Sequence, residues 1–267
     1  MPALALALAL AAVALEPESA LPAETATDLA GRAEALDAAP DACPFGLGLG
    51  DPVALDPAVP GGRQRLLLPG LFSAGGIGPY RSVALLSEDA GRSWREVMPT
   101  TPGSEVSEVV SRGDEVFALV AFGVEGPGPV DLWHSPDAGR TWSLRAHFEK
   151  RNPLGVVHGL AFTDPMHGRV IVDYDGMDLV PPADLQVTED GGRTWRIAGP
   201  APKAAAPSPA SDAPGLWRVR RGPKDTQVVE RRSPGSKRWR TAATLPLRYR
   251  RAADGTFTPC VGPPAKR

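Results

Sequence analysis

Short runs in which apolar and polar positions alternate recur along the chain, and clusters of Gly, Pro, Asp and Ser separate them. Alternation with a period of two is typical of strands, and such clusters are typical of turns. The pattern therefore predicts an all-β fold with very short connections. The predicted strands are Val53–Leu55, Arg63–Leu68, Arg81–Ser87, Ser93–Met98, Glu105–Ser111, Glu115–Phe122, Val130–Ser135, Thr141–Phe148, Val156–Thr163, Gly168–Tyr174, Leu185–Thr188, Thr194–Ala198, Leu216–Arg221, Thr226–Arg232, Arg238–Thr244, Leu247–Arg251 and Thr256–Val261.

An eight-residue phrase, Ser/Thr-x-Asp-x-Gly-x-Ser/Thr-Trp, occurs at the end of three of these strands. The complete copies are Ser87–Trp94, Ser135–Trp142 and Thr188–Trp195, and Arg232–Trp239 is a degenerate fourth copy. Their Trp positions are separated by 48, 53 and 44 residues. A recurrence at this spacing indicates a supersecondary unit that is repeated in space.

The phrase resembles the Asp box, or BNR repeat, of sialidase-like β-propellers. The resemblance implies that each box joins the two outer strands of a blade at the periphery and serves the structure. Its Asp and Ser/Thr are expected to bond backbone groups, its Gly to adopt a positive φ, and its Trp to pack between blades. The predicted structural residues are Asp89, Gly91, Trp94, Asp137, Gly139, Trp142, Asp190, Gly192, Trp195 and the degenerate copy's Trp239. Ser233–Gly235 replace the Asp of the fourth copy, which is predicted to be a simple turn.

The repeats predict a small β-propeller of four or five blades over residues 43–262, with five favoured. Three blades carry complete boxes, one is degenerate, and a composite blade is expected from strands of both chain ends, closing the ring. The photosystem II stability and assembly factors are similar in repeat type. Residues 199–215 form a tract of Pro, Ala and Ser that is predicted to be flexible.

The beginning of the chain predicts export. Ala3–Leu15 has the length of a signal-peptide apolar region, and Ala12–Ala14 offers a cleavage site, although Met1 and Pro2 provide no positive charge. Residues 1–14 are interpreted as the signal peptide, 15–42 as an acidic Ala-rich linker and 263–267 as a tail. The mature protein is expected in the periplasm, outside the cell or on its surface, without a transmembrane segment.

The two cysteines, Cys43 and Cys260, lie near opposite ends of the mature chain. In an exported protein the simplest interpretation is one disulfide, which would lock the closure of a propeller by its two ends. The alternative is two unrelated thiols.

Charge is distributed unevenly along the chain. Residues 216–267 contain 14 Lys and Arg against three acidic residues, while the whole chain has a net charge of −2. This basic segment could present a patch to an anionic partner such as a cell-wall polymer, a phosphate-rich glycan or an acidic protein. The favoured interpretation is that Arg218, Arg220 and Arg231 face solvent and balance the rest of the ring.

The sequence offers little catalytic chemistry. The Phe/Tyr-Arg-Ile-Pro signature of sialidases is absent, and Tyr80-Arg81 is the nearest string. Asp173–Asp178 clusters three carboxylates that could bind Ca²⁺, but an inter-strand turn is favoured. The four His are scattered without ligand spacing: His134, His147, His158 and His167. No catalytic, cofactor or metal residues are predicted.

These observations favour an exported non-catalytic β-propeller, acting as a monomer that binds or assembles a protein or glycan partner and not nucleic acid. The alternative is a glycoside hydrolase-like BNR-repeat enzyme or a carbohydrate-binding protein. A central depression with convergent carboxylates and an Arg would favour the enzyme. A depression lined by small or mixed polar residues would favour the binding module.

Overall fold

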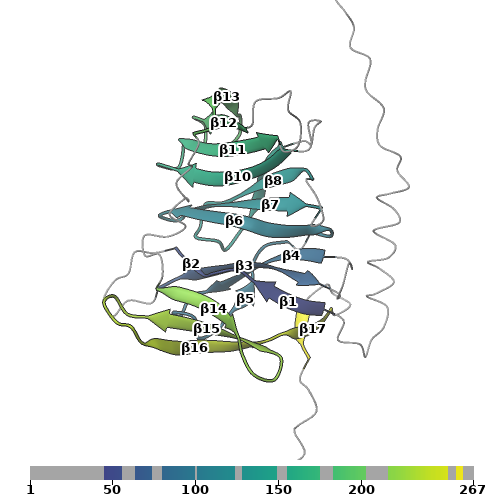
Figure 1. Ribbon diagram of the computed structural model, residues 1–267, viewed down its shortest axis with the longest axis vertical. Coiled ribbons are helices and arrows are strands. Elements are labelled where there is room, and N and C mark those ends of the chain that lie inside the picture. Colours follow the sequence, from purple (N-terminus) through teal and green to yellow (C-terminus); the bar gives the residue numbers. More distant parts are fainter. Residues whose placement is uncertain are drawn as a thin grey trace, which may run out of the picture.

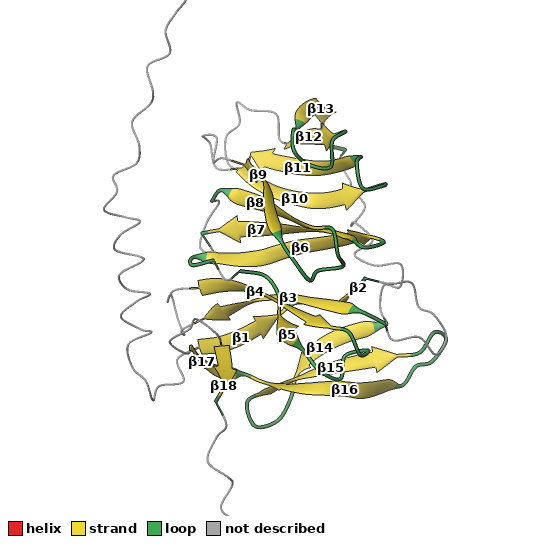
Figure 2. Ribbon diagram, turned by 180° about the vertical axis from the view of Figure 1, so that it is seen from behind, coloured by secondary structure: helices red, strands yellow, loops and turns green. Residues whose placement is uncertain are grey.

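The computed structural model describes residues 45–55, 64–73, 80–99, 101–123, 128–148, 155–174, 183–202, 216–251 and 257–260. Within these ranges the regular secondary structure is entirely β-strand, in four antiparallel sheets arranged like propeller blades (Figures 1 and 2). The predicted all-β propeller class is confirmed. Closure of the four sheets into a ring stays a prediction.

Sheet I brings the two ends of the described chain together. Its strand order is β18-β17-β1-β3-β4-β5, with β2 pairing β3. Phe45 of β1 lies opposite Tyr249 of β17, and Tyr249 lies opposite Pro259 of β18. The strands are β1 (Phe45–Leu49), β2 (Val53–Ala54), β3 (Leu66–Ser73), β4 (Tyr80–Ser87), β5 (Arg95–Glu96), β17 (Arg248–Arg251) and β18 (Phe257–Pro259).

The terminal strands therefore extend the first blade. The described strands make four sheets, and the separate composite blade of the favoured five-blade arrangement is not formed among them. The physical reason is that β1 pairs on both edges, with β3 on one side and β17 on the other, so all of these strands belong to one hydrogen-bonded sheet.

Sheets II, III and IV each come from one continuous stretch of chain. Sheet II contains β6 (Ser104–Arg112), β7 (Glu115–Phe122), β8 (Val130–Ser135) and β9 (Ser143–Phe148). Sheet III contains β10 (Gly155–Phe162), β11 (Gly168–Tyr174), β12 (Ala183–Thr188) and β13 (Arg196–Pro200). Sheet IV contains β14 (Trp217–Arg221), β15 (Thr226–Arg232) and β16 (Trp239–Pro246). The predicted strands lie within these elements, with ends displaced by a few residues.

One strand, β1, is missing from the sequence prediction. Its Gly46 and Gly48 weaken the strand signal because Gly is depleted in strands. Close packing requires glycine on the neighbouring β3, where a Cβ on Gly70 would lie 2.2 Å from the carbonyl oxygen of Gly48, whereas a Cβ on Gly46 or Gly48 would make only ordinary contacts. The predicted strand Arg63–Leu68 also ends too early, because β3 continues to Ser73 and pairs with β4 along its whole length.

Buried side chains form three core clusters, one in each interface between neighbouring sheets. The sheets are stacked in the order IV, I, II, III from bottom to top of Figure 1. Leu66, Phe72 and Trp217 lie between sheets IV and I. Leu67, Leu86 and Val116 lie between sheets I and II. Between sheets II and III, the rings of Phe117 and Phe162 stack with centroids 3.7 Å apart.

Polar contacts also cross each interface. The carboxylate of Glu108 in β6 accepts the N–H groups of Gly159 and Leu160 at 2.8 and 2.7 Å, where β10 has an irregular register. Glu88 of the first box pairs with Arg140 of the second at 2.6 Å. The indole N–H of Trp217 donates to the side-chain oxygen of Gln64 at 3.1 Å. Because buried polar groups need partners, these contacts restrict how each sheet can sit on the next.

Candidate functional site

The three complete boxes fold into the same hydrogen-bonded turn. In the first box, Asp89 Oδ1 accepts the N–H groups of Arg92 and Ser93 at 2.9 and 2.8 Å, and Oδ2 accepts the Ser93 hydroxyl at 2.6 Å. Ser87 donates its hydroxyl to Asp89 and accepts the N–H of Gly91. The equivalent bonds form around Asp137 and Asp190. Each carboxylate is thus engaged by its own turn.

The backbone of each box requires left-handed residues. Gly91, Gly139 and Gly192 have φ values of 82, 82 and 85°. The residue before each glycine is also left-handed: Ala90 and Ala138 in the first two boxes, and a glycine in the third. L-residues with a Cβ pay a steric penalty there, and the bonds to the box Asp offset it.

These hydrogen bonds also stabilise the ionised form of the box carboxylates. Partial burial by itself raises the pKa of Asp89, but the bonds from Ser93, Ser87 and Arg92 outweigh it and hold the pKa at about 2. The same balance holds the pKa of Asp137 at about 2. The hydroxyl and N–H of Thr194 lower the pKa of Asp190 further still. A carboxylate with so low a pKa is a poor proton donor or acceptor near neutral pH.

Each box Trp packs against the core between its own sheet and the sheet before it in the stacking order IV, I, II, III. Trp94 lies against the cluster between sheets IV and I, Trp142 against that between I and II, and Trp195 against that between II and III. Their indole N–H groups donate to the box Gly carbonyls at 3.1, 3.0 and 3.1 Å. These contacts place the box Trp rings at the sheet interfaces, whereas the structural role of the boxes and their membership of the Asp-box family stay predictions.

The fourth turn is built differently. Ser236 N–H donates to Ser233 C=O at 3.0 Å across Pro234 and Gly235, and Gly235 has a φ of 74°. This is the bonding of a simple β-turn with Pro and Gly at its centre. Trp239 carries the guanidinium of Arg218 over its ring at 4.1 Å and that of Arg232 at 5.0 Å.

Three of the four His side chains contact carboxylates within the described residues. His134 contacts Glu115 and Arg145, and burial is the main cause that lowers its pKa. His147 pairs with Asp131 at 2.5 Å, and His167 with Asp164 at 2.9 Å. Groups of three or more potential metal ligands are absent from the described part of the chain.

Several other predicted features lie partly or wholly outside the described residues. Asp173 lies in β11, but the rest of the carboxylate cluster, Asp175–Asp178, lies outside the described residues, so a turn or a Ca²⁺ site there stays untested. The predicted signal peptide and linker, residues 1–42, also lie outside, as do residues 203–215 of the Pro/Ala tract. In the ranges that the structure describes, no helix is long and apolar enough to span a membrane.

The proposed disulfide cannot be placed as a bond because Cys43 lies outside the described residues. Cys260 directly follows β18, and its N–H donates to the carbonyl of Arg248 at 2.9 Å. Phe45, two residues after Cys43, pairs with β17, which also pairs with β18. The disulfide stays a prediction that this meeting of the chain ends supports.

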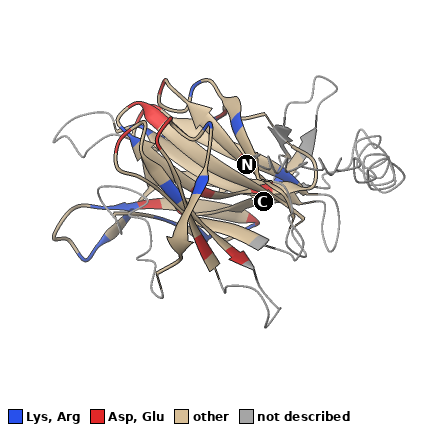
Figure 3. Cartoon of the chain, turned by 90° about the horizontal axis from the view of Figure 1, so that it is seen from above, with Lys and Arg blue, Asp and Glu red and all other residues tan. Residues whose placement is uncertain are grey.

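The basic residues of sheet IV are not merely solvent-facing. Arg218 and Arg220 both pair with Glu230, at 2.6 and 2.9 Å, and the Glu230 side chain is only 8% exposed. Burial by itself raises the pKa of Glu230, but its bonds to the two guanidiniums outweigh this and lower it. Arg231 lies over the ring of Trp217 at 5.5 Å. Figure 3 maps the charged residues on the chain.

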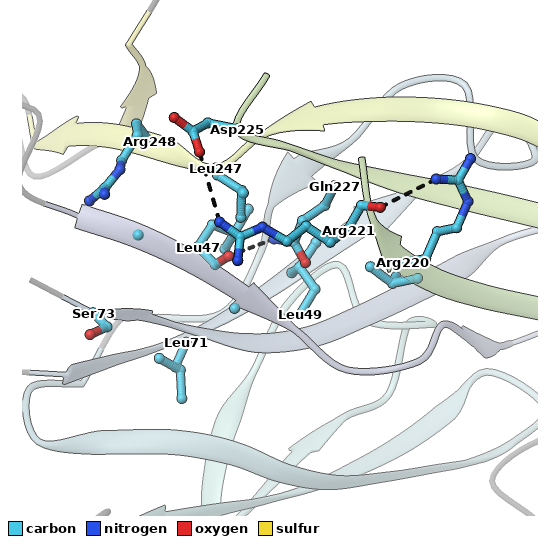
Figure 4. Close-up of a pocket in the computed structure, with 13 residues that line it drawn as sticks. Leu47, Leu49, Leu71, Ser73, Arg220, Arg221, Asp225, Gln227, Leu247 and Arg248 are labelled. Atoms are coloured by element: carbon cyan, nitrogen blue, oxygen red, sulfur yellow. Dashed lines mark hydrogen bonds and ion pairs between the residues drawn. The ribbon is translucent and has the colours of Figure 1, made fainter. Parts of the chain in front are cut away.

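A cavity of about 480 Å³ opens where sheet IV meets the terminal strands of sheet I (Figure 4). Gly46 and Gly48 of β1 and Ser73 of β3 line one side. The other side carries four polar side chains from sheet IV and one from β17: Arg220, Arg221, Asp225, Gln227 and Arg248. We call this the arginine cavity.

Hydrogen bonds between distant segments hold the walls of the arginine cavity in place. The Leu47 N–H donates to Leu247 C=O, and the Leu247 N–H donates to Asp225 C=O, both at 2.8 Å. The Gln227 side-chain amide donates to Leu47 C=O at 2.5 Å (Figure 4). The first described strand and the last blade thus enclose one site.

The arginine cavity has an excess of positive charge. Arg220 is oriented by Glu230. Arg221 meets Asp225 at 3.9 Å, and their side chains are 82 and 69% exposed, so this pair is loose (Figure 4). Asp225 is the single carboxylate among the described lining residues, against three guanidiniums. Guanidinium forks match carboxylate, phosphate and sulfate oxygens well.

Sequence reasoning did not find this site. The sequence indicated the basic segment and a possible anionic partner. It did not indicate that Gly46, Gly48 and Ser73 line a cavity, since they do so only because β1 pairs with β17 and β3.

Comparisons with known proteins add little. No family model matches the chain, and no curated protein matches it. Among solved structures, a GH74 enzyme of Niastella koreensis is similar with a TM-score of 0.35 and 17% identity, over 73% of this chain and 30% of that chain. A GH74 xyloglucanase from Xanthomonas campestris has a TM-score of 0.26 and 14% identity, over 69% of this chain and 37% of that chain. This chain thus spans well under half of either. At these scores neither likeness supports a function, and the fold assignment rests on the strand pairing.

Proposed function

We propose that this protein is an exported, non-catalytic β-propeller that binds an anionic partner, a protein or a glycan, through the arginine cavity. The observation that carries the proposal is the cavity lining: three guanidiniums, small residues and one carboxylate at a junction of two blades. The lining also includes Gln227 and five aliphatic residues: Leu47, Leu49, Leu71, Val219 and Leu247.

Electrostatics supports the choice of ligand class. Arg221 is held only loosely by Asp225, and no described partner faces the guanidinium of Arg248 among the contacts of the cavity (Figure 4). Hydrogen bonds to ionised groups contribute about 1.5–3 kcal/mol each, so two guanidiniums would provide useful affinity and strong selectivity for anions. The glycines leave space on this side of the cavity. A Cβ added to Gly48 would lie no closer than 3.8 Å to a neighbouring atom.

The enzymatic alternative needs more than the arginine cavity offers. Most glycoside hydrolases use two carboxyl groups on opposite sides of the scissile bond. Asp225 has no second carboxylate beside it among the described lining residues. The box carboxylates are engaged by their own turns. The binding module is therefore the better supported of the two.

The test is a glycan array that contains uronic-acid, sialylated and sulfated glycans beside their neutral counterparts, together with a set of acidic and basic peptides. We expect binding of acidic members that weakens with salt. The Arg221→Ala/Arg248→Ala variant should lose about tenfold or more in affinity. The matched control is Lys237→Ala/Arg238→Ala, in the exposed turn of the same sheet but outside the cavity.

Gly48→Leu provides a test that leaves every charge in place. Its side chain would enter the cavity, and the nearest atoms allow a Cβ, so the fold should persist while anion binding is lost. Equal loss in the Lys237/Arg238 control would show a diffuse charge effect and contradict the proposal. Turnover in a parallel panel of fluorogenic glycosides would favour the enzyme instead.

A further inference from the structure

A second cavity, of about 510 Å³, lies between sheets I and IV and shares no residue with the arginine cavity. Along β3 and β17 the two cavities take alternate residues: Ser73 and Arg248 line the arginine cavity, whereas Phe72 and Tyr249 line the second one. Successive residues of a strand point to opposite faces, so the two sites are physically separate. We call the second site the edge groove.

The walls of the edge groove are two sheet edges. One wall is the end of the first box and β5, the last strand of sheet I. The other wall is residues 243–246 of β16, the last strand of sheet IV. β5 pairs only with β4, and β16 only with β15, among the described strands. An edge strand presents unpaired N–H and C=O groups that can accept another strand.

The floor of the edge groove is apolar and aromatic. Phe72 and Leu85 of sheet I are buried, and the rings of Phe72 and Tyr249 meet edge to face with centroids 5.2 Å apart. Trp94 is half-buried at the side. Burial raises the pKa of Tyr249 to about 12, so its phenol stays protonated and can donate a hydrogen bond. An apolar side chain would be well placed here, with a donor beside it.

The rim of the edge groove is basic. The first wall carries two exposed arginines, Arg92 and Arg95, and one half-buried carboxylate, Glu96, so arginine is in excess by one. Glu88, the acidic neighbour of Arg95, is already held by Arg140 at 2.6 Å, which leaves Arg95 at 3.7 Å from it. Like charges beside an edge disfavour pairing between two copies of the chain and favour a strand of opposite charge.

We propose that the edge groove binds an extended acidic segment of a partner protein, which adds as a strand to β16 and places an apolar side chain on the Phe72–Tyr249 floor. In this mode the main chain provides affinity and the cavity selects the side chain. The inference does not depend on the anion binding proposed for the arginine cavity, because the residues and the faces are different.

The direct test uses two fluorescein-labelled peptides of about ten residues, the upper end of normal strand length, that alternate Glu with Val or Lys with Val. Fluorescence anisotropy with the full chain should show binding of the Glu/Val peptide that weakens with salt, and at least tenfold weaker binding of the Lys/Val peptide. Hydrogen exchange should show new protection in β16, residues 241–245, when the Glu/Val peptide is bound.

A matched pair of variants distinguishes a specific effect of the rim arginines on peptide binding from a general effect of the charge of the protein. Arg92→Glu/Arg95→Glu should weaken Glu/Val binding about tenfold. The control is Arg193→Glu/Arg196→Glu, the same box positions in sheet III, where Arg196 pairs with Glu189 at 2.7 Å and neither residue lines the arginine cavity or the edge groove. Affinity of this control should stay within about twofold.

Thr244→Trp tests the groove itself, because Thr244 is exposed and lines it, so the larger ring fills the groove without entering the core. This variant should abolish binding of the Glu/Val peptide while its anion binding at the arginine cavity persists. Equal affinity for both peptides, no binding of either, protection outside β16, or an equal effect of the control pair would each overturn the inference.

Discussion

Sheets I, II and III differ from sheet IV in what their turns and aromatic residues are used for. In the first three, a complete box engages its carboxylate in its own turn and places its Trp against the preceding interface. In sheet IV the Asp is gone, and Trp239 carries two guanidiniums over its ring instead. Both cavities described above border sheet IV. Both cavities also border sheet I, which carries a complete box, so the proposed binding belongs to the junction of sheets I and IV and not to sheet IV alone.

The charges also differ between these sheets. The described acidic groups of the boxes are balanced by hydrogen bonds within each turn. Sheet IV concentrates cations around one buried carboxylate, Glu230, and contributes Arg220 and Arg221 to the arginine cavity, whereas Arg248 comes from β17 of sheet I. A blade that no longer builds a box is thus free to change its surface without loss of a packing contact.

The largest effect should come from removing the predicted cross-link between the two chain ends, which meet in sheet I. Reduction of the Cys43–Cys260 disulfide should lower the free energy of unfolding by about 4–5 kcal/mol, since a long loop is no longer constrained in the unfolded chain. Urea denaturation with and without reductant measures the change. Cys43→Ser/Cys260→Ser should be insensitive to reductant, and an unchanged wild-type midpoint would rule the disulfide out.

A Trp of a complete box and the Trp of the degenerate copy should lose different amounts of unfolding free energy when each is replaced by Ala. Trp142→Ala removes ring packing between sheets I and II and should cost about 3 kcal/mol of unfolding free energy. Trp239→Ala removes only the stacking of Arg218 and Arg232 and should cost about 1 kcal/mol. Denaturant midpoints of the two purified variants decide this. Equal costs would mean that the fourth blade still packs through its Trp.

Two glycine substitutions compare a complete box with the degenerate turn. Gly192→Ala places a Cβ 2.6 Å from Leu132 at a φ of 85°, so left-handed strain and overpacking add to about 2–3 kcal/mol. Gly235→Ala, at a φ of 74°, meets no atom within 4 Å and should cost about 1 kcal/mol from strain alone. Thermal unfolding followed by circular dichroism would rank them, and the reverse order would contradict the packing described for the third box.

The smallest effect is the pH dependence of the boxes. Asp89 and Asp137 have pKa values lowered from 3.8 to about 2 in the folded protein, so they stabilise it at pH values above about 4. This contribution should disappear as the pH falls from about 4 to about 2, by less than about 1 kcal/mol for each because solvent screens these partly exposed groups. Urea midpoints between these pH values measure it, and Asp89→Asn/Asp137→Asn should flatten the profile. If the variant has the same pH dependence of the urea midpoint as the wild type, the charges of these carboxylates do not stabilise the fold.

The sequence alone determined the class of fold, the strands of four sheets and the box turns. These features depend on residues close together in the chain: a two-residue period, the Asp and Ser/Thr that bond neighbouring N–H groups, and glycines at positive φ. The same locality explains why Ser233–Gly235 could be predicted as a plain turn.

Only the tertiary structure decided where β1 pairs, how many sheets the described strands make, and where the cavities lie. Leu47 meets Gln227 and Leu247, and Phe72 meets Tyr249, across most of the length of the chain. Gly46 and Gly48 weaken the local strand signal, yet the pairing of β1 with β3 and β17 makes them part of sheet I. Local patterns determine which segments become strands, whereas contacts between distant segments determine which residues share a cavity, because those contacts exist only after the sheets have packed.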